Sequence, residues 1–231
     1  MIDILIDFDV DDILRCKHII NMLKIKVKKL WFHLTGLLDE QGSLQSYVRQ
    51  QTKFKKRYPN YSIGTATYGM PIVHDLNEGT TLKIGAYCSI ARNVEIFLGA
   101  NHRIDWISSY PFPAFIEEAS HIENYSVSRG DVIIGNDVWL CANCTILSGV
   151  TIGHGAVIAS GAVISQNVEP YAVMAGNPAK QVKWRFEEPI RSAILKSGWW
   201  DWSEDEIKQI VNKLCSANIE EFLDYVRLRD N

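Results

Sequence analysis

Residues 134–164 read IGNDVWLCANCTILSGVTIGHGAVIASGAVI, and an aliphatic residue returns at every sixth position. A helix repeats near 3.6 residues and a strand at 2, so neither explains this period. A coil that turns a corner every six residues does explain it, with the aliphatic side chains pointing inward. The periodic residues are Ile84, Ile90 and Ile96, and then Ile134, Leu140, Ile146, Ile152, Ile158 and Ile164. Small residues follow many of them: Gly85, Ala91, Gly135, Cys141, Gly153 and Ala159.

The period also predicts how the chain is divided. Three hexapeptides make one triangular coil of 18 residues, and stacked coils bury a continuous aliphatic column. We therefore expect a mainly β body over residues 61–180. The period stops after Ile96 and resumes at Ile134, which predicts a projecting loop at about 98–131. Such loops on rigid scaffolds tend to carry function.

The carboxyl-terminal segment, residues 181–231, predicts a helical cap for the coils. Its expected helices cover residues 187–196, 204–214 and 219–226. Ser203-Glu204-Asp205-Glu206 has the pattern of a capping box at the start of the second helix. Trp199, Trp200 and Trp202 could stack on a ligand, but clustered aromatic residues between helices usually pack a core.

We expect the first 60 residues to form an appendage made of a short strand and a basic amphipathic helix. Apolar residues alternate with aspartates over residues 2–10. Residues 14–38 predict a helix with a lysine-rich face, which can lie on a membrane surface or dock on the main body. These lysines argue against a membrane-spanning helix. The residues after Met1 are acidic and lack the basic segment that begins a signal peptide, so we expect no signal peptide.

The composition is that of an ordinary globular protein. Hydrophobic residues make up 47% of the 231 residues, and the net charge of −3 argues against nucleic acid as a partner. Five cysteines, an odd number, predict a reducing, cytoplasmic location. Cys141 and Cys144 form a CxxC, which is typical of redox or zinc sites. Cys141 falls on a small-residue position, however, so we favour structural filling.

The chemistry is expected in the loop, where Asn101-His102-Arg103-Ile104-Asp105-Trp106 follows the break. Histidine titrates near neutrality and can accept a proton from a hydroxyl or amine. A lone histidine is more often structural, but His102 has polar neighbours, and Asn101 and Asp105 are its expected supports. Asp105 could orient His102 or pair with Arg103. The rings of Trp106 and Tyr110 could cover a sugar or an antibiotic.

Several segments resemble the hexapeptide-repeat xenobiotic acetyltransferases, which include type B chloramphenicol and streptogramin acetyltransferases. The resemblance covers roughly residues 60–210 and leaves the first 60 uncovered. It implies a left-handed parallel β-helix, a homotrimer with active sites between subunits, and acetyl-CoA as the acetyl donor. The matching segments are Thr67-Tyr68-Gly69, residues 84–91, Asn101–Trp106, Tyr110-Pro111-Phe112, residues 134–139, Ala175–Lys180 and residues 198–202.

The same resemblance implies roles for individual residues. His102 matches the general base, and Trp139 matches a tryptophan that lines the cofactor channel, although it could simply pack. Two small-residue segments would border the pantetheine arm, although tight corners need small residues anyway, and Lys180 would meet the cofactor phosphates. The segments are Ala159-Ser160-Gly161 and Gly176-Asn177-Pro178. Tyr68, Trp106 and Tyr110 are expected at the acceptor.

The acceptor is not encoded in any motif. We expect a hydroxyl or amine of a sugar or surface-glycan precursor, with an antibiotic as the alternative. A metal-dependent hydratase on the same repeat would need three placed ligands. His102, His121 and His154 lack the close pair of histidines that such enzymes use, so we expect no metal. A non-catalytic scaffold would leave the Asn-His-Arg loop without a purpose.

Overall fold

The structure is a computed structural model, and it describes residues 46–229. The chain divides into two compact units, Met1–Arg49 and Gln50–Asn231. The strand expected at residues 2–10 and the basic helix expected at residues 14–38 lie outside the described residues. The architecture below is that of the second unit.

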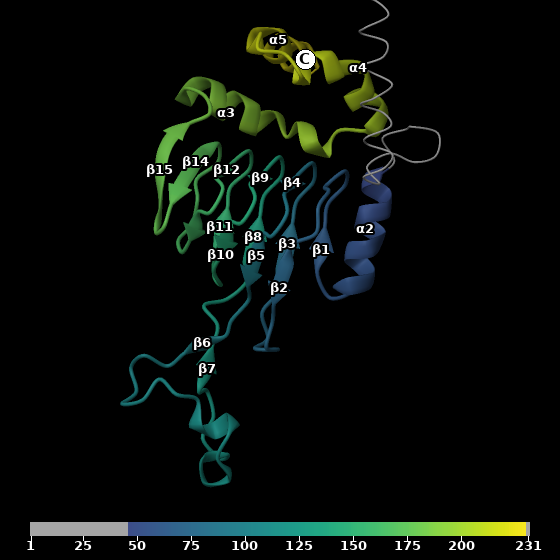
Figure 1. Ribbon diagram of the computed structural model, residues 1–231. Helices are drawn as coiled ribbons and strands as arrows, with labels where there is room; N and C mark the ends of the chain where they lie inside the picture. Colours follow the sequence, from purple (N-terminus) through teal and green to yellow (C-terminus); the bar gives the residue numbers. More distant parts are fainter. Residues whose placement is uncertain (1–45, 230–231) are drawn as a thin grey trace, which may run out of the picture. The chain divides into compact units, whose positions relative to one another are not determined.

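Short strands in three sheets form the coil body (Figure 1). Sheet A contains β1 (Ser62–Ile63), β3 (Leu82–Ile84), β8 (Val132–Ile134) and β11 (Thr151–Ile152). Sheet B contains β4 (Ser89–Ile90), β9 (Trp139–Leu140), β12 (Val157–Ile158), β14 (Ala172–Gly176) and β15 (Ala179–Trp184). Sheet C contains β2 (Ile72–His74), β5 (Glu95–Phe97), β10 (Thr145–Ile146) and β13 (Val163–Ile164).

The chain visits the three sheets in turn, and equivalent residues stack from coil to coil. Ile84 pairs with Ile134, which pairs with Ile152, and these neighbours run parallel. Among the described strands of these three sheets, only β14 and β15 pair antiparallel. The expected mainly β fold with parallel sheets is confirmed.

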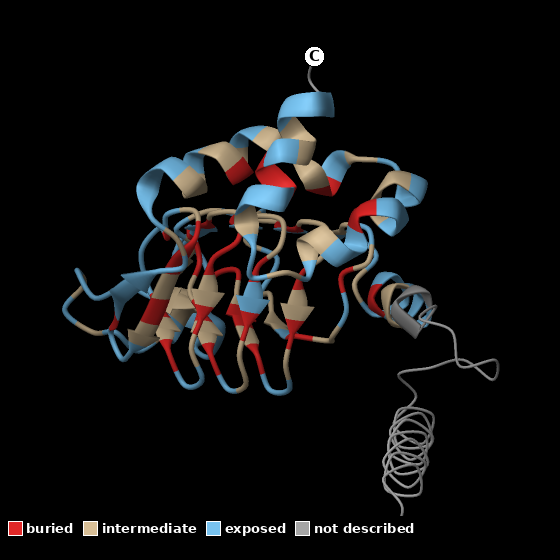
Figure 2. Ribbon diagram, turned by 90° about the horizontal axis from the view of Figure 1, so that it is seen from above, coloured by how far each residue is buried: buried red, intermediate tan, exposed pale blue. Residues whose placement is uncertain are grey.

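Two columns of side chains fill the interior. The nine periodic aliphatic residues are 3% exposed or less, as predicted. A second column, two residues before each of them, is buried equally well and was not anticipated. Figure 2 shows buried positions recurring along the coil. Its members are Leu82, Cys88, Val94, Val132, Val138, Cys144, Val150, Ala156 and Ala162.

At the corners between strands, a left-handed backbone conformation recurs with the same six-residue period. The third residue after seven of the nine periodic aliphatics has a positive φ, between 56° and 76°; the exceptions follow Ile96 and Ile164, where the regular coils end. These residues are Tyr87, Asn93, Asp137, Asn143, Gly149, Gly155 and Gly161. The small residues directly after the aliphatics serve a different purpose, because coils approach closely there. A Cβ on Gly85 would lie 2.6 Å from the backbone of Gly135 in the next coil.

Residues 98–131, which we call the excursion, leave the coil between β5 and β8, at the corner between sheets C and A. Its stem is a two-stranded antiparallel hairpin of β6 (Asn101–His102) and β7 (Ser126–Val127), which extends away from the stacked coils (Figure 1). Two 3₁₀ turns, Phe112–Ala114 and Glu117–Ala119, form part of its outer end.

The helix α2 (Ser46–Arg57) was not predicted, and it changes the expected boundary. Its Phe54 is fully buried in the same core cluster as the coil residues, with Tyr58 and Tyr61 packed alongside. The compact unit therefore begins at Gln50, rather than at the residue 61 expected from the repeats.

Helices also follow the coils, as predicted: α3 (Glu188–Ser197), α4 (Glu204–Leu214) and α5 (Ile219–Arg229), with a 3₁₀ turn at Trp199–Asp201. The Ser203 hydroxyl caps α4 by accepting a hydrogen bond from the Glu206 backbone N–H at 3.2 Å. Trp200 is buried and stacks on His154 of the coil, with ring centroids 4.6 Å apart. The tryptophans thus contribute to packing between the helices and the coil corner.

Candidate active site

His102 lies at the end of β6, and its side chain is exposed. Its Nδ1 is 2.9 Å from the backbone carbonyl oxygen of Ser109. A carbonyl oxygen can only accept a hydrogen bond, so Nδ1 must carry a proton in this contact. In the neutral ring the lone pair is then on Nε2, which can accept a proton from another molecule. The geometry suits a general base.

Asp105 pairs with Arg103, one of the two options that the sequence left open. The Arg103 Nε donates to Asp105 Oδ1 at 2.7 Å, and a second guanidinium nitrogen contacts Oδ2. This hydrogen bonding lowers the pKa of Asp105 to about 2. The guanidinium carbon of Arg103 also lies 5.1 Å from the centre of the Trp106 ring. The three side chains form one local cluster on the excursion.

Asn101 anchors the excursion to the coil body. Its Nδ2 donates to the carbonyl oxygen of Val127 at 3.0 Å and to Ser148 Oγ at 3.1 Å. Ser148 is buried, between β10 and β11. Farther out, Tyr110 is half exposed and contacts Phe112 edge to face, with ring centroids 4.9 Å apart.

Tyr68 and Trp139 lie on sheet B, away from the excursion. A register line on this sheet joins Tyr68 to Ser89, Ser89 to Trp139 and Trp139 to Val157. Both aromatic side chains are exposed, 42% for Tyr68 and 54% for Trp139. The small Ser89 separates them. The structure thus brings Tyr68 and Trp139 to one face, while His102 leaves from the corner opposite that sheet.

The other expected cofactor residues lie at the edges of sheet B. Ala159, Ser160 and Gly161 form the corner between β12 and β13, and nothing lies within 4 Å of a Cβ built on Gly161. Gly176 and Asn177 belong to the turn between β14 and β15, which contains a cis Asn177–Pro178 bond. Lys180 is exposed on β15 opposite Ala175. These residues offer an open, small-residue surface for an extended ligand.

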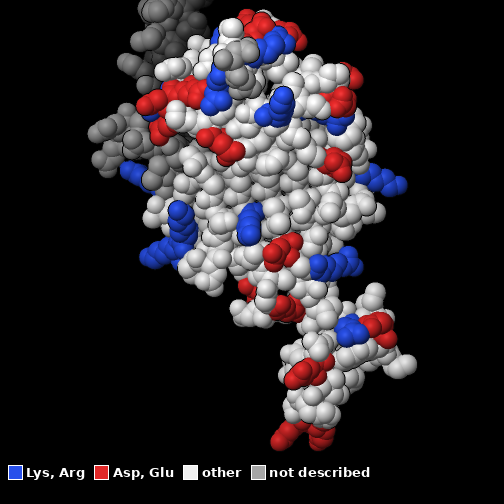
Figure 3. Space-filling view, turned by 180° about the vertical axis from the view of Figure 1, so that it is seen from behind, with Lys and Arg blue, Asp and Glu red and all other residues white. Residues whose placement is uncertain are grey.

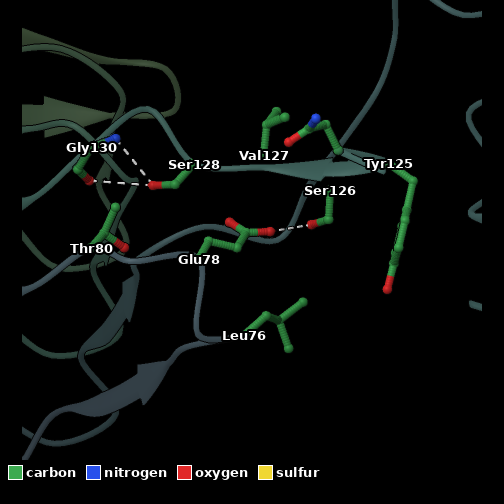
Figure 4. Close-up of a pocket in the computed structure, with 9 residues that line it drawn as sticks. Leu76, Glu78, Thr80, Tyr125, Ser126, Val127, Ser128 and Gly130 are labelled. Atoms are coloured by element: carbon green, nitrogen blue, oxygen red, sulfur yellow. Dashed lines mark hydrogen bonds between the residues drawn. The ribbon is translucent and has the colours of Figure 1, made fainter. Parts of the chain in front are cut away.

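No sequence motif marks Glu78, which lies at the base of the excursion. It lines an open pocket of about 520 Å³ together with Leu76, Thr80, Asn124, Tyr125, Ser126, Val127, Ser128 and Gly130 (Figure 4). Glu78 is the only charged residue in this lining. Its segment, between β2 and β3, lies within the repeat region but departs from the six-residue period, so no signal in the sequence could have found it.

The cysteines fit a packing role better than a reactive one. Cys144 is fully buried, and burial raises the pKa of its thiol to about 12; burial also raises the pKa of Cys141. Among residues 46–229, no three His, Cys, Asp or Glu side chains gather in a way that could hold a metal ion. His154 accepts a hydrogen bond from the Asn136 backbone N–H at 2.9 Å instead.

Within the described part of the chain, no helix has both the length and the hydrophobicity to cross a membrane. Charges of both signs are scattered over the face shown in Figure 3. Acidic side chains gather there at the far end of the excursion.

The structure thus joins a stack of hexapeptide coils to a projecting hairpin with an exposed histidine, and the hexapeptide stack is the part that known transferases share. The family model for bacterial transferase hexapeptide (six repeats) matches residues 131–166. A chloramphenicol acetyltransferase from Escherichia coli is 40% identical over 158 residues, which are 67% of this chain and 74% of that protein. The chain belongs to the hexapeptide-repeat xenobiotic acetyltransferase family, and it is an acetyltransferase.

Two further relatives have different named activities. A probable macrolide acetyltransferase from Lysinibacillus sphaericus is 42% identical over 157 residues, covering 66% of this chain and 87% of that protein. A virginiamycin A acetyltransferase from Staphylococcus aureus is 38% identical over 149 residues, covering 62% and 66%. The resemblance drawn from the motifs is therefore confirmed at the level of the family.

Proposed function

We propose that this protein transfers an acetyl group from acetyl-CoA to an acceptor hydroxyl or amine, with His102 as the general base. The observation that carries this proposal is the contact between His102 Nδ1 and the Ser109 carbonyl, because it leaves Nε2 as the proton acceptor. Acetyl-CoA supplies the acetyl group as an activated thioester. Trp139, Ala159, Ser160, Gly161, Gly176, Asn177 and Lys180 would border it.

The reaction needs no covalent enzyme intermediate. Nε2 of His102 takes the proton from the acceptor as its oxygen or nitrogen attacks the thioester carbonyl. The imidazolium then returns that proton to the departing thiolate, so His102 ends the cycle neutral. The Ser109 carbonyl keeps the ring oriented in both steps, because it accepts the same Nδ1 hydrogen in either charge state.

We also propose a left-handed coil and a homotrimer whose active sites lie between subunits. The position of His102 supports this arrangement, since the excursion leaves between sheets C and A while Trp139 and Tyr68 stand on sheet B. The three sheets form the three sides of the coil, so within one chain His102 and the pair Tyr68 and Trp139 face different directions. A second copy can bring its sheet B to the hairpin of the first.

Two acceptor classes are supported by different observations. The pocket beside the hairpin combines hydroxyls, an amide and a tyrosine ring, a mixture that suits a sugar or an amino sugar of a surface-glycan precursor. The named activities of the relatives favour an antibiotic instead. Neither class requires a change in the mechanism above.

The deciding experiment follows thiol release from acetyl-CoA with a panel of acceptors, and mass spectrometry identifies the acetylated product. The panel contains sugars, amino sugars, chloramphenicol, a macrolide and a streptogramin. We expect His102→Ala to lower turnover by about 10²- to 10⁴-fold. His121→Ala, which changes another exposed histidine of the excursion, should retain activity. Full turnover by His102→Ala would refute the assignment of the base.

A further inference from the structure

The carboxylate of Glu78 holds both stems of the excursion. Its Oε2 accepts a hydrogen bond from the Ala100 backbone N–H at 3.1 Å, on the outgoing stem. Its Oε1 accepts a hydrogen bond from the Ser126 hydroxyl, on the returning stem. Figure 4 shows the side chain reaching from the coil body to Ser126. One side chain thus bridges residues that are 26 positions apart in the sequence.

The chain around this contact is shaped to admit the carboxylate. A Cβ on Gly99 would lie 2.7 Å from Cδ of Glu78 and would overlap its Oε2, so only glycine fits there with this geometry. The next residue, Ala100, has a φ of 64°, which is unusual for a residue with a side chain. Its N–H is the group that Glu78 accepts from, so this hydrogen bond helps to hold the outgoing stem in a strained conformation.

The hairpin register places His102 directly opposite Ser126, the residue that Glu78 contacts. Ser126 and His102 are directly paired across β6 and β7, so their side chains lie on the same face of the hairpin. The neighbouring pair, Asn101 and Val127, is held through the bond from Asn101 to Ser148. The hairpin is therefore fixed to the coil body at two points, through Glu78 and through Ser148.

We propose that Glu78 is a positioning residue for acetyl transfer, which sets the place of His102 by fixing both stems of the excursion. The proposal rests on the proposed role of His102 as the base. Glu78 has no proton-transfer step of its own in this arrangement. Substitution of Glu78 should lower the rate of the chemical step. It should leave the binding of acetyl-CoA unchanged, because the expected donor surface lies on sheet B.

Steady-state kinetics of Glu78→Gln and Glu78→Ala test the proposal. The amide of Gln keeps one acceptor oxygen and loses the other, whereas Ala loses both. We expect kcat to fall by about 10-fold and about 100-fold respectively, since small displacements of catalytic groups have effects of this size. KM for acetyl-CoA should change less than about twofold. Glu118→Gln is the matched control, because Glu118 is an exposed carboxylate of the excursion that lies outside this pocket.

A second readout does not depend on activity. Chymotrypsin should cleave the excursion at Tyr110, Phe112 or Phe115 faster in Glu78→Ala than in the wild type, while the thermal midpoint stays the same. Unchanged kcat with unchanged cleavage would overturn the proposal. A large fall in the thermal midpoint that accounts for the lost kcat would also overturn it. If His102→Ala keeps full turnover, the proposed base fails, whereas the cleavage rates still test whether Glu78 fixes the excursion.

Discussion

At the scale of single residues, the tautomer of His102 depends on one backbone group. The Ser109 carbonyl accepts from Nδ1, which fixes the ring without placing a negative charge beside it. In many enzymes a carboxylate has this orienting role. Here the nearby carboxylate, Asp105, is occupied by Arg103. In this loop a backbone carbonyl therefore orients His102, while Asp105 and Arg103 stabilise the local fold.

We predict that Asp105→Asn lowers kcat/KM by less than about tenfold, whereas loss of an orienting carboxylate lowers kcat by about 10⁴-fold in a serine protease. The pKa of Asp105 is lowered to about 2 by the hydrogen bond from Arg103, so the carboxylate stays ionised between pH 4 and 9. The pH profile of the variant should therefore keep its shape. Arg103→Gln should have a similar effect, because it breaks the same pair. A loss above about a hundredfold in Asp105→Asn alone would assign Asp105 to His102 instead.

At the scale of elements, two glycines of the coil meet two different structural requirements. Gly85 lacks a side chain because the next coil approaches its Cα, whereas Gly161 adopts a φ of 71° in open space. The first requirement is steric contact between coils, and the second is local backbone conformation. Substitution by alanine should separate them.

We predict that Gly85→Ala lowers the free energy of unfolding by about 3 kcal/mol, because a Cβ would press on the Gly135 backbone. Gly161→Ala should lower it by only about 1 kcal/mol, which is the effect of a left-handed conformation alone. Urea titrations of the two variants and the wild type measure the difference. Equal losses would show that the coils can separate slightly at Gly85.

The contact between the coil and the C-terminal helices should depend on pH through His154. Burial lowers the pKa of His154 below 6.5, and its Nδ1 accepts from Asn136 only while it is unprotonated. The unfolded chain binds this proton more readily, so the stabilisation is complete above pH 6.5 and is lost as the pH falls through the folded pKa. The thermal midpoint of the wild type should therefore fall more between pH 7 and pH 5 than that of His154→Gln. Parallel curves would contradict this.

The sequence predicted the elements that repeat one residue type and missed those that do not. The inward aliphatics were visible because Ile or Leu returns every six residues. The second buried column mixes Leu, Cys, Val and Ala, so its period is hidden by variation in size. The helix α2 was missed because Phe54 is a single buried apolar residue among the described side chains of a basic segment. At the candidate site, the motif pointed to His102, which stays a proposal; the contacts from the Ser109 carbonyl and from Glu78 had no signal, because one is a backbone group and the other lies outside every motif.

At the scale of the whole molecule, the topology of one chain separates the expected base from the expected donor surface. The excursion begins where sheet C gives way to sheet A, and sheet B is the remaining side of the coil. A ring of copies related by rotation can join the two surfaces at every interface. This is the arrangement proposed above.

Two measurements test it. Light scattering should give a mass of about 79 kDa, three times the 26.2 kDa of the chain. His102→Ala and Trp139→Ala should each be poorly active alone, but their co-assembly should restore about a quarter of the wild-type activity, because some interfaces combine two intact surfaces. The control is a mixture of the two variants that were purified as separate trimers and do not exchange subunits. No recovery after co-assembly would mean that each chain supplies its own site.

The register across the excursion has a consequence for how such proteins diversify. Ile84 pairs directly with Ile134, so the coils meet as neighbours although 50 positions separate them in the sequence. Insertions, deletions or replacements beyond the stem, between residues 103 and 125, can therefore accumulate without disturbing the stack. In the arrangement proposed above, the part of the acceptor site on the excursion can change while sheet B, the expected donor surface, stays the same. Exchange of this segment between relatives is accordingly a practical route to new acceptor preferences.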